Sequence, residues 1–388
     1  MVYVYWSAGI VLALAWFSRI VDAALGVPKI ADISKSHWDR QPQSHPRVSI
    51  IVPARNEEED IEECLRELLS LDYDNYEVLV VDDRSTDRTG EIIQRVSTTS
   101  EAHGRLKVIR VSDLPPGWLG KAHAMWTAGE QAASDWLLFT DADVLFKPDV
   151  LRRALAYAEA ETADHVVVFP RMIMKRPGER MMIAFFQTLF TFGHRPWKVA
   201  DPDTKDHMGV GAFNMVRRSA YDAVGTYRAL RMEVLDDMKL GKVIKNARFR
   251  QRNVFGEDLI SIHWAQGAMG VVHNLTKNFF AVLSFQWWRG IVAVFGLLFL
   301  NLGPFVGVGL AHGWERAPYL VALGAMFLIY LGMSFKSSIP PYYFFLHPLS
   351  TLLFGYTLVR SMFLTFYNDG VTWRGTTYPL KELRKGLV

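Results

Sequence analysis

Two aspartates, Asp141 and Asp143, directly follow an apolar segment in the sequence DWLLFTDADV (135–144). Carboxylates at the end of a buried strand are costly unless a ligand uses their charge. Mg²⁺ is such a ligand, because it prefers oxygen atoms and leaves several coordination positions to water and substrate phosphates. We therefore predict a divalent-metal site that receives a diphosphate; the alternative is a turn that begins the next helix.

Two further motifs carry charges that could contact a nucleotide. Asp82 and Asp83 end the segment YEVLVVDD (76–83), where carboxylates can accept hydrogen bonds from a nucleobase or a ribose. Lys121 begins a helix-like segment after the loop PPGWLG (115–120). Main-chain N–H groups at a helix start attract anions, so a lysine there can hold a diphosphate. The alternative for Lys121 is an ordinary solvated lysine.

The pair Asp236-Asp237 stands in MEVLDDMKLGKVIK (232–245), whose apolar spacing predicts a helix that begins at these acids. Acidic residues in the first turn of a helix ordinarily complement the helix dipole. The functional interpretation makes one of the two a general base, which must lie within hydrogen-bond reach of an attacking hydroxyl.

The elements that would position these residues alternate along the chain. Strands are predicted at 47–52, 76–83, 105–111 and 135–144, and helices between them at 56–71, 85–96 and 121–132. This order predicts an α/β fold with a mostly parallel sheet and helices on both faces. In such sheets ligands bind beyond the carboxyl ends of the strands, where the acidic motifs lie. The first strand lacks the glycine patterns of dinucleotide-binding and P-loop proteins.

Composition limits the partners. The 388 residues include 43 basic and 40 acidic ones, a formal charge of +3, which gives no basic stripe for nucleic acid. The one cysteine, Cys64, lies in an acidic stretch and is expected to be buried and structural. A chain with a single cysteine forms no internal disulfide, which suits a reducing compartment.

Four apolar runs approach the ~20 residues that span a bilayer: 2–18, 291–311, 317–335 and 342–359. We expect an anchor at 1–27, a cytoplasmic domain at 28–278, a membrane region of about three helices at 279–368 and a basic tail at 369–388. Arg19 favours a cytoplasmic domain by the positive-inside rule. Three later spans would leave the basic tail outside, against the same rule, so either one run is not a simple span or the rule is overridden.

The stretch AVLSFQWWRG (281–290) precedes the second run. Its tryptophans and arginine are typical of a membrane interface. Gln286 followed three residues later by Arg289 is also a known catalytic pattern, so both interpretations stay open.

Seven segments resemble family 2 glycosyltransferases, which have a GT-A fold. They are SIIVPARNEEE, VLVVDDRSTDRT, GWLGKAHAM, LLFTDADV, VGAFNMVRRSAYDAVGTY, VLDDMKLG and QWWR, in the family's order between residues 47 and 289. The membrane layout resembles the branch that glycosylates lipids, which includes ceramide, carotenoid (diaponeurosporenoate) and hopanoid-associated transferases. The closing GVTWRGTTYPL (370–380) is similar to the end of the bacterial carotenoid and hopanoid members.

The resemblance implies a role for each motif. Residues expected around the nucleoside are Pro53, Arg55, Glu57, Asp82 and Asp83. Lys121 is expected at the diphosphate, Asp141 near the ribose, and Asp143 on a Mg²⁺ or Mn²⁺ ion, with Asp141 beside it. Asp237 is expected to be the base, with Asp236 in place of the family's usual glutamate, and residues 209–214 to line the sugar and acceptor side.

Where the family's signature reads Gln-x-x-Arg-Trp, this chain has Gln286, Arg289 and then Gly290. In processive polysaccharide synthases that tryptophan helps to hold the acceptor, so its absence argues against a processive enzyme. It also leaves open whether Gln286 and Arg289 are the true counterparts.

The implied function is inverting, metal-dependent transfer of one sugar, expected to be glucose, from a nucleotide-sugar such as a UDP-sugar to a lipid in the bacterial inner membrane. The alternatives are a polyprenyl-phosphate sugar transferase, a polysaccharide synthase, and a non-catalytic membrane scaffold with a relic nucleotide site.

Overall fold

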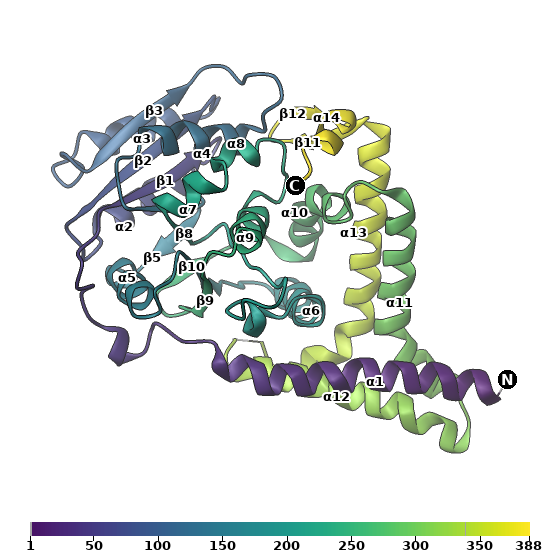
Figure 1. The fold of residues 1–388 in the computed structure, drawn as a ribbon. Coiled ribbons are helices and arrows are strands. Elements are labelled where there is room, and N and C mark those ends of the chain that lie inside the picture. Colours follow the sequence, from purple (N-terminus) through teal and green to yellow (C-terminus); the bar gives the residue numbers. More distant parts are fainter. Residues whose placement is uncertain (1, 338) are drawn as a thin grey trace. The chain divides into compact units, whose positions relative to one another are not determined.

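The computed structural model describes residues 2–337 and 339–388 (Figure 1). The chain forms two compact units. The sheet unit comprises Ile30–Ile173, Lys198–His263 and Lys381–Val388, and the helical unit comprises Met1–Lys29, Met174–Trp197 and Trp264–Leu380. The expected boundaries at 27, 278 and 368 separate predicted membrane segments from the predicted cytoplasmic domain, whereas the two units are defined by packing. These boundaries remain predictions.

The sheet unit is built on a seven-stranded sheet with the order β3-β2-β1-β4-β8-β6-β9. Its strands are β1 (Val48–Ala54), β2 (Tyr76–Asp83), β3 (Leu106–Val111), β4 (Trp136–Phe139), β6 (His165–Phe169), β8 (Asn214–Arg217) and β9 (Gln251–Phe255). All neighbouring strands are parallel except β8, which runs antiparallel to β4 and β6. The predicted mixed α/β fold with a mostly parallel sheet is confirmed. A smaller sheet joins β5 (Val144–Phe146), β10 (Ile260–Ile262) and β7 (Arg171–Met172).

Helices connect these strands. They are α2 (Ile61–Leu69), α3 (Thr89–Ser97), α4 (Gly120–Gln131), α5 (Val150–Ala160), α7 (Arg218–Ala223), α8 (Thr226–Ala229), α9 (Asp236–Asn246) and the closing α14 (Leu380–Lys385). The apolar face of α2 is buried and includes Cys64, as expected from the helical spacing. However, α2 begins five residues later than predicted, because Asn56 has a left-handed backbone (φ 54°) and its segment forms a loop.

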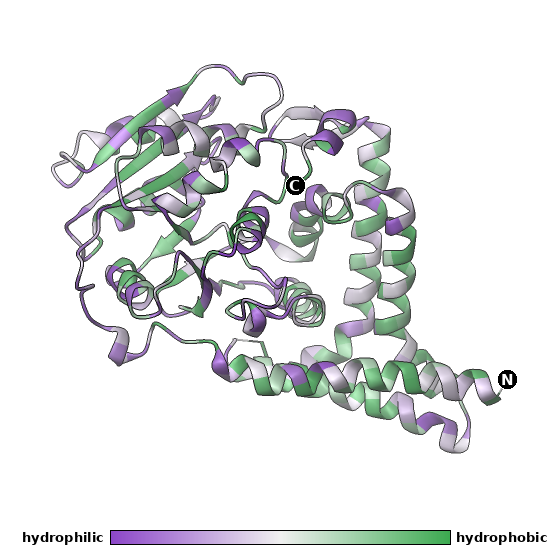
Figure 2. Cartoon of the chain, viewed as in Figure 1, coloured by the Kyte–Doolittle hydropathy of each residue, from purple (hydrophilic) through white to green (hydrophobic). Residues whose placement is uncertain are grey.

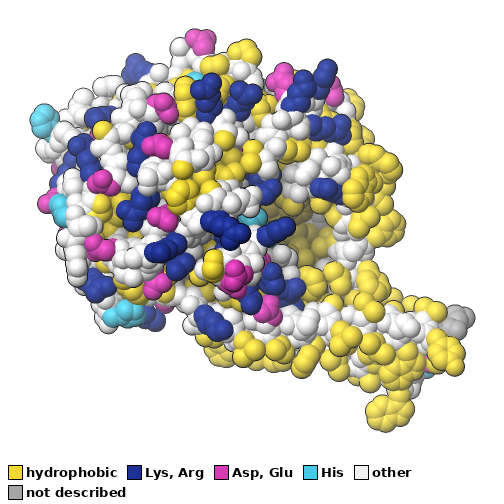
Figure 3. Space-filling view, viewed as in Figure 1, with side chains coloured by type: hydrophobic (Ala, Val, Ile, Leu, Met, Phe, Trp, Pro, Cys, Tyr) yellow, Lys and Arg dark blue, Asp and Glu magenta, His cyan; other side chains and the backbone are white. Residues whose placement is uncertain are grey.

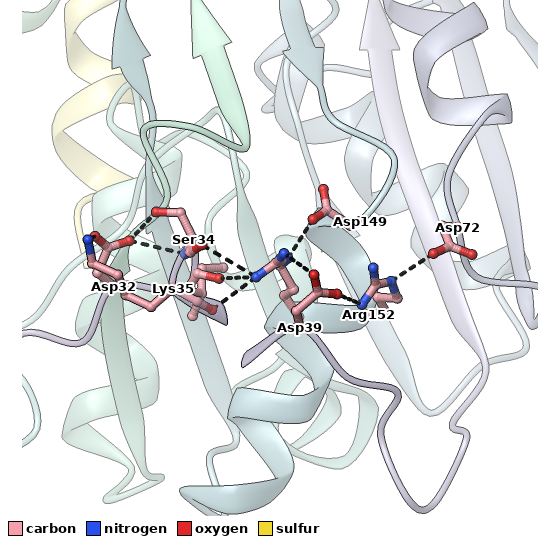
Figure 4. A network of polar contacts seen from close by, with 9 residues as sticks. Asp32, Ser34, Lys35, Asp39, Asp72, Asp149 and Arg152 are labelled. Atoms are coloured by element: carbon pink, nitrogen blue, oxygen red, sulfur yellow. Dashed lines mark hydrogen bonds and ion pairs between the residues drawn. The ribbon is translucent and has the colours of Figure 1, made fainter. Parts of the chain in front are cut away.

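The polar segment before β1 is fastened to α5 (Figure 4). Arg152 on α5 donates to Asp72 at 2.8 Å and also pairs with Asp39. Arg153 pairs with Asp39 at 2.7 Å and donates to the main-chain oxygens of residues 33–35. Because both arginines bond Asp39 and further groups of the chain, they hold the segment in place where it leads into β1.

The helical unit contains α1 (Val2–Gly26), α6 (Pro177–Gly193), α10 (Gly267–Val282), α11 (Trp287–Leu310), α12 (Ala317–Ser334), α13 (His347–Tyr367) and the hairpin β11–β12 (Gly370–Trp373, Thr376–Pro379). Short 3₁₀ helices in the chain are Val27–Lys29, Ser36–Trp38, Pro196–Lys198, Gly313–Arg316 and Pro341–Leu346. Within this unit α1 lies along α12, and α11 lies along α13 (Figure 1).

Four helical segments among the described residues are long and apolar enough to cross a membrane: Val2–Lys29, Trp287–Leu310, Gly313–Ser334 and Pro341–Tyr367. Figure 2 shows their apolar colouring, and in Figure 3 hydrophobic side chains cover these helices whereas charged side chains gather over the sheet unit. Inside the helical unit, His347 bonds both Tyr330 (3.0 Å) and Asn301 (3.1 Å), so these buried polar side chains satisfy one another.

Candidate active site

The carboxyl ends of β1 and β2 bring the predicted nucleoside residues together. The two strands are parallel neighbours with Ala54 paired to Asp82. Their following loops are bonded to each other, because the Thr86 N–H donates to Asn56 Oδ1 (2.8 Å) and the Glu57 N–H donates to Thr89 Oγ1 (2.7 Å). Pro53, Arg55, Glu57, Asp82 and Asp83 therefore share one edge of the sheet, as the parallel topology predicts. Their contacts with a nucleotide remain a prediction.

Both aspartates of β2 also shape their own loop. Asp83 is buried and accepts two hydrogen bonds from Arg84, at 2.8 and 3.0 Å. Asp82 Oδ1 accepts from the Ser85 N–H at 3.3 Å. Its Oδ2 lies 2.7 Å from where a Cβ on Gly90 would stand, so a larger residue there would displace the Asp82 carboxylate.

Asp143 has the features of a metal ligand. Its Oδ1 atom is buried and has no hydrogen-bond partner within residues 2–337 and 339–388. Burial, with the nearby charges of Asp141 and Glu57, raises the pKa of Asp143 to about 7. An unpartnered oxygen in a negative environment fits a divalent cation. The described residues hold no cluster of three metal-ligating side chains, so phosphates and water would have to complete the coordination.

Lys121 joins the metal motif to the acid pair. It is the second residue of α4, and its Nζ atom lies 2.6 Å from Asp141 Oδ1 and 3.7 Å from Asp236 Oδ1. Burial alone would lower the pKa of Lys121, but the charges of Asp141, Asp236 and Asp237 outweigh it and raise the pKa. Lys121 is therefore a permanent positive charge between motifs that lie about 100 residues apart in sequence.

Gly211 connects the same two motifs through its main chain. The Asp141 N–H donates to Gly211 O at 3.0 Å, and the Gly211 N–H donates to Asp237 Oδ2 at 3.0 Å. A Cβ on Gly211 would stand 2.4 Å from Asp141 Oδ2, and one on Gly209 would stand 1.8 Å from Asp237 O. The segment 208–211 thus packs against the first turn of α9 at distances that only glycine allows.

The two acids of α9 have different surroundings. Asp236 is buried, 4% exposed, and its Oδ2 accepts from Tyr227 Oη at 3.3 Å. Asp237 is partly exposed and accepts main-chain N–H groups from Gly211 and from Met238 (2.7 Å). Burial and the charge of Asp236, opposed by Lys121, raise the pKa of Asp237 to about 6. A partly exposed carboxylate with a pKa near neutrality is suited to general-base work.

A buried network that the sequence did not reveal supports this helix start. His165 on β6 bonds Asn214 Oδ1 and, at 2.7 Å, Gln251 Nε2. Asn214 Nδ2 in turn donates to Asp237 O at 3.4 Å. Burial lowers the pKa of His165 to about 4, so the ring is neutral and serves positioning. Single polar residues within strands carry no sequence signal of such contacts; only the 209–214 motif pointed to this region.

Gln286 and Arg289 belong to the helical unit, and their catalytic role remains a prediction. Gln286 precedes α11, and Arg289 is exposed with its guanidinium 5.3 Å from the Trp288 ring. The glycine that follows Arg289 lies where α11 contacts α13. A Cβ on Gly290 would stand 2.3 Å from Met362 Sδ, so a larger side chain there would displace the Met362 side chain.

Comparison with known proteins identifies a family and several relatives. The family described as Glycosyl transferase family 2 matches residues 49–225. A 4,4'-diaponeurosporenoate glycosyltransferase of Staphylococcus haemolyticus (strain JCSC1435) is 23% identical over 278 residues, which cover 68% of this chain and 72% of the relative. The protein of the same name from Staphylococcus aureus (strain bovine RF122 / ET3-1) is 21% identical over 350 residues, 87% of this chain and 90% of the relative.

Among solved structures, the mannosyltransferase PcManGT from Pyrobaculum calidifontis, in complex with GDP-Man and Mn²⁺, has a TM-score of 0.56 at 20% identity. The match covers 94% of this chain and 99% of that one, and it shows a shared fold. Residues 49–225 thus form a family 2 glycosyltransferase domain with a GT-A fold, and the chain is a glycosyltransferase.

Proposed function

We propose that this glycosyltransferase moves one sugar, glucose, from a UDP-sugar to the carboxyl group of a carotenoid-type lipid acid, with inversion and with a divalent cation. The observation that carries the proposal is the convergence on Lys121, whose Nζ contacts Asp141 of the metal motif at 2.6 Å and lies 3.7 Å from Asp236 of the acid pair. The positive charge of Lys121 thus lies where the donor's leaving group and the attacking acceptor would meet.

The acceptor class rests on two supports. The relatives named above act, by their names, on diaponeurosporenoate, a carotenoid carboxylate. In addition, four helical segments of the described chain are apolar enough to cross a membrane, which a water-soluble acceptor would not require. We therefore propose an integral membrane protein whose sheet unit faces the cytoplasm, where nucleotide-sugars are available.

The chemistry of the proposal is a single displacement. Next to Asp236 and Asp237 the acceptor's carboxyl group is protonated, because like charges nearby disfavour its ionised form. Asp237 takes that proton while the acceptor oxygen bonds to the anomeric carbon. The bond from this carbon to the phosphate oxygen breaks, and the diphosphate leaves with the electron pair. One displacement inverts the configuration.

Lys121 stabilises the charge that grows on the leaving diphosphate. Asp143 and Asp141 would hold the divalent ion, which when bound neutralises phosphate charge as a Lewis acid. The Mn²⁺ and GDP-Man in the related mannosyltransferase structure are consistent with a metal-assisted nucleotide site in this fold.

The test is to incubate the purified full-length protein in lipid nanodiscs with radiolabelled UDP-glucose, Mg²⁺ or Mn²⁺, and 4,4'-diaponeurosporenoate. Labelled glucosyl ester in the organic extract supports the proposal. Labelled product formed only with a polyprenyl phosphate as acceptor would instead indicate a polyprenyl-phosphate sugar transferase. Label found only in a growing polymer would indicate a polysaccharide synthase.

A further inference from the structure

The last eight residues of the chain return to the sheet unit after the chain has passed through the helical unit. Within this segment Leu383 is fully buried, and Gly386 lies so near Met232 that a Cβ on the glycine would stand 2.3 Å from that side chain. The segment 381–388, which we name the closing segment, is thus packed rather than loosely attached. Neither its basic residues nor the proposed reaction accounts for this packing.

The closing segment is bonded to both sides of the turn that starts α9. The Val388 main-chain oxygen accepts from Lys239 Nζ at 2.8 Å and from Lys242 Nζ at 2.9 Å, and both lysines are on α9. The Val388 N–H donates to a carboxylate oxygen of Glu233, which precedes the helix. Because Lys239 Nζ also lies 3.0 Å from Glu233 Oε1, Glu233, Lys239 and Val388 form one closed arrangement, to which Lys242 adds a further contact with Val388.

Glu233 gives this arrangement its rigidity. Its side chain is only 3% exposed, so its charge needs the partners that Lys239 and the Val388 N–H supply. Charge-assisted hydrogen bonds are shorter and more directional than neutral ones. The turn from Glu233 to Lys239 is therefore tied at both ends, and it contains the acid pair Asp236-Asp237.

The first turn of α9 is thus held by two separate parts of the chain. The glycine segment 208–211 fixes Asp237 through the Gly211 N–H, and the closing segment fixes the turn through Glu233 and Lys239. A general base must stay within hydrogen-bond reach of its proton, and a misplacement of about 1 Å can cost about 10²-fold in rate.

We propose that the closing segment is a positioning element for the acid pair, with Glu233 and Lys239 as its positioning residues. The proposal rests on the proposed role of Asp237 as the base. It assigns a task in the reaction to a segment of the chain that lies far from the donor motifs in sequence.

The test compares three variants with the wild-type protein in nanodiscs: removal of residues 386–388, Glu233→Gln, and the control Lys385→Met, which alters an exposed lysine of the same segment. We expect the first two to lower kcat by about 10-fold to 10²-fold while the KM for the nucleotide-sugar changes less than about threefold. The control should match the wild type. Lys239→Arg should retain most of the kcat, because it keeps the charge beside Glu233.

Unchanged kcat in Glu233→Gln and in the truncated protein would overturn the proposal. So would an equal loss of kcat, nucleotide-sugar binding and melting temperature in Glu233→Gln, because that pattern indicates a purely structural role. If the truncated protein does not fold, Glu233→Gln alone decides. Asp237→Asn separates the two proposals. Full activity in that variant would contradict the role of Asp237 as the base. A strongly impaired Asp237→Asn together with an unaffected Glu233→Gln would contradict only the role of the closing segment.

Discussion

The Gly211 N–H lies 3.0 Å from Asp237 Oδ2, and this single hydrogen bond ties the proposed base to the metal motif. The carbonyl of the same glycine accepts from the Asp141 N–H at 3.0 Å. One peptide segment therefore sets the spacing between the donor side and the acceptor side of the site. A sugar that passes from one to the other requires that spacing to be constant.

Gly211→Ala tests this spacing. The new methyl group would stand 2.4 Å from Asp141 Oδ2, so either the carboxylate or the loop must move. We expect kcat to fall by about tenfold or more, because small displacements of reacting groups are costly. Gly296→Ala on α11 is the matched control, since no described atom lies within 4 Å of that Cβ. Equal kcat values in the two variants would mean that the Gly211 segment does not set the geometry.

Asp237→Asn should lower kcat by about 10²-fold, the lower end of the range for a general base, because a carboxylic acid gives up its proton more easily than an alcohol. Asp236→Asn should cost less, because Asp236 is buried against Tyr227 and acts on Asp237 through its charge. The measurement is single-turnover transfer from labelled UDP-glucose. The reverse order of the two losses would assign the base to Asp236.

The activity should depend on pH through Asp237. Burial and the charge of Asp236 raise its pKa to about 6, against the opposing charge of Lys121, and Asp141 adds to the rise. A base works only when deprotonated, so kcat/KM should fall as pH drops through about 6. It should also fall at higher pH, where the acceptor carboxyl loses the proton that Asp237 has to take. In Asp236→Asn the acid limb should move to lower pH, since a raising charge is lost. If the acid limb of the pH profile does not move in Asp236→Asn, a group other than Asp237 causes it.

Asp143→Asn should abolish the effect of divalent ions on the affinity for UDP. The unpartnered Oδ1 atom is the oxygen that would bind the ion, and an amide is a weaker ligand than a carboxylate. We expect the affinity for UDP, measured by calorimetry, to rise with Mn²⁺ in the wild type and to be independent of Mn²⁺ in the variant. Asp149→Asn is a control that should retain the response, because Asp149 precedes α5 and pairs with Arg153. If the variant still binds UDP more tightly with Mn²⁺, the metal site must be formed by other residues.

In the proposed membrane protein, the chain's return to the sheet unit limits its course. Residues 30–173, 198–263 and 381–388 fold together, so they would lie on one side of the bilayer, and the chain between His263 and Lys381 would cross it an even number of times. At least one of the three apolar helices there would then not be a single crossing. With the sheet unit in the cytoplasm, as proposed, residues 381–388 would lie on the side that the positive-inside rule favours.

Cysteine labelling checks this topology. In a Cys64→Ala background, Glu59→Cys and Glu382→Cys each place a thiol at an exposed position, one on either side of the helical unit in sequence. Both should be shielded from a membrane-impermeant maleimide in spheroplasts and should react after permeabilisation. Opposite labelling of the two positions would contradict the shared unit.

The alternation of apolar strands and amphipathic helices predicted the order of the first elements and the edge where the acids gather. The strand at 76–83 was placed correctly because its apolar run is bounded by turn residues on both sides. Strand β8 was missed, since Asn214–Arg217 is short and its antiparallel place depends on two distant partners. The late start of α2 was missed because nothing local shows that Asn56 takes a left-handed backbone.

The types of the site residues were readable, whereas their contacts were not. Asp-x-Asp after a strand pointed to a metal, but the pairing of Lys121 with both Asp141 and Asp236 joins segments that only the folded chain brings together. His165 and Glu233 carry no motif and were not predicted, and Tyr227 ends the segment VGAFNMVRRSAYDAVGTY without an expected role. Gly290, which stands where the family has a tryptophan, packs closely against Met362.

The central claim is that this enzyme attaches one sugar to a lipid acid. Mass spectrometry of the lipid extract from nanodiscs that contain the protein, UDP-glucose, Mg²⁺ and 4,4'-diaponeurosporenoate tests it most directly. A product heavier than the acceptor by one hexose residue, formed about 10²-fold more slowly with Asp237→Asn, is the predicted result. An unchanged acceptor with every nucleotide-sugar tried, or a product that carries a chain of sugars, would contradict the account.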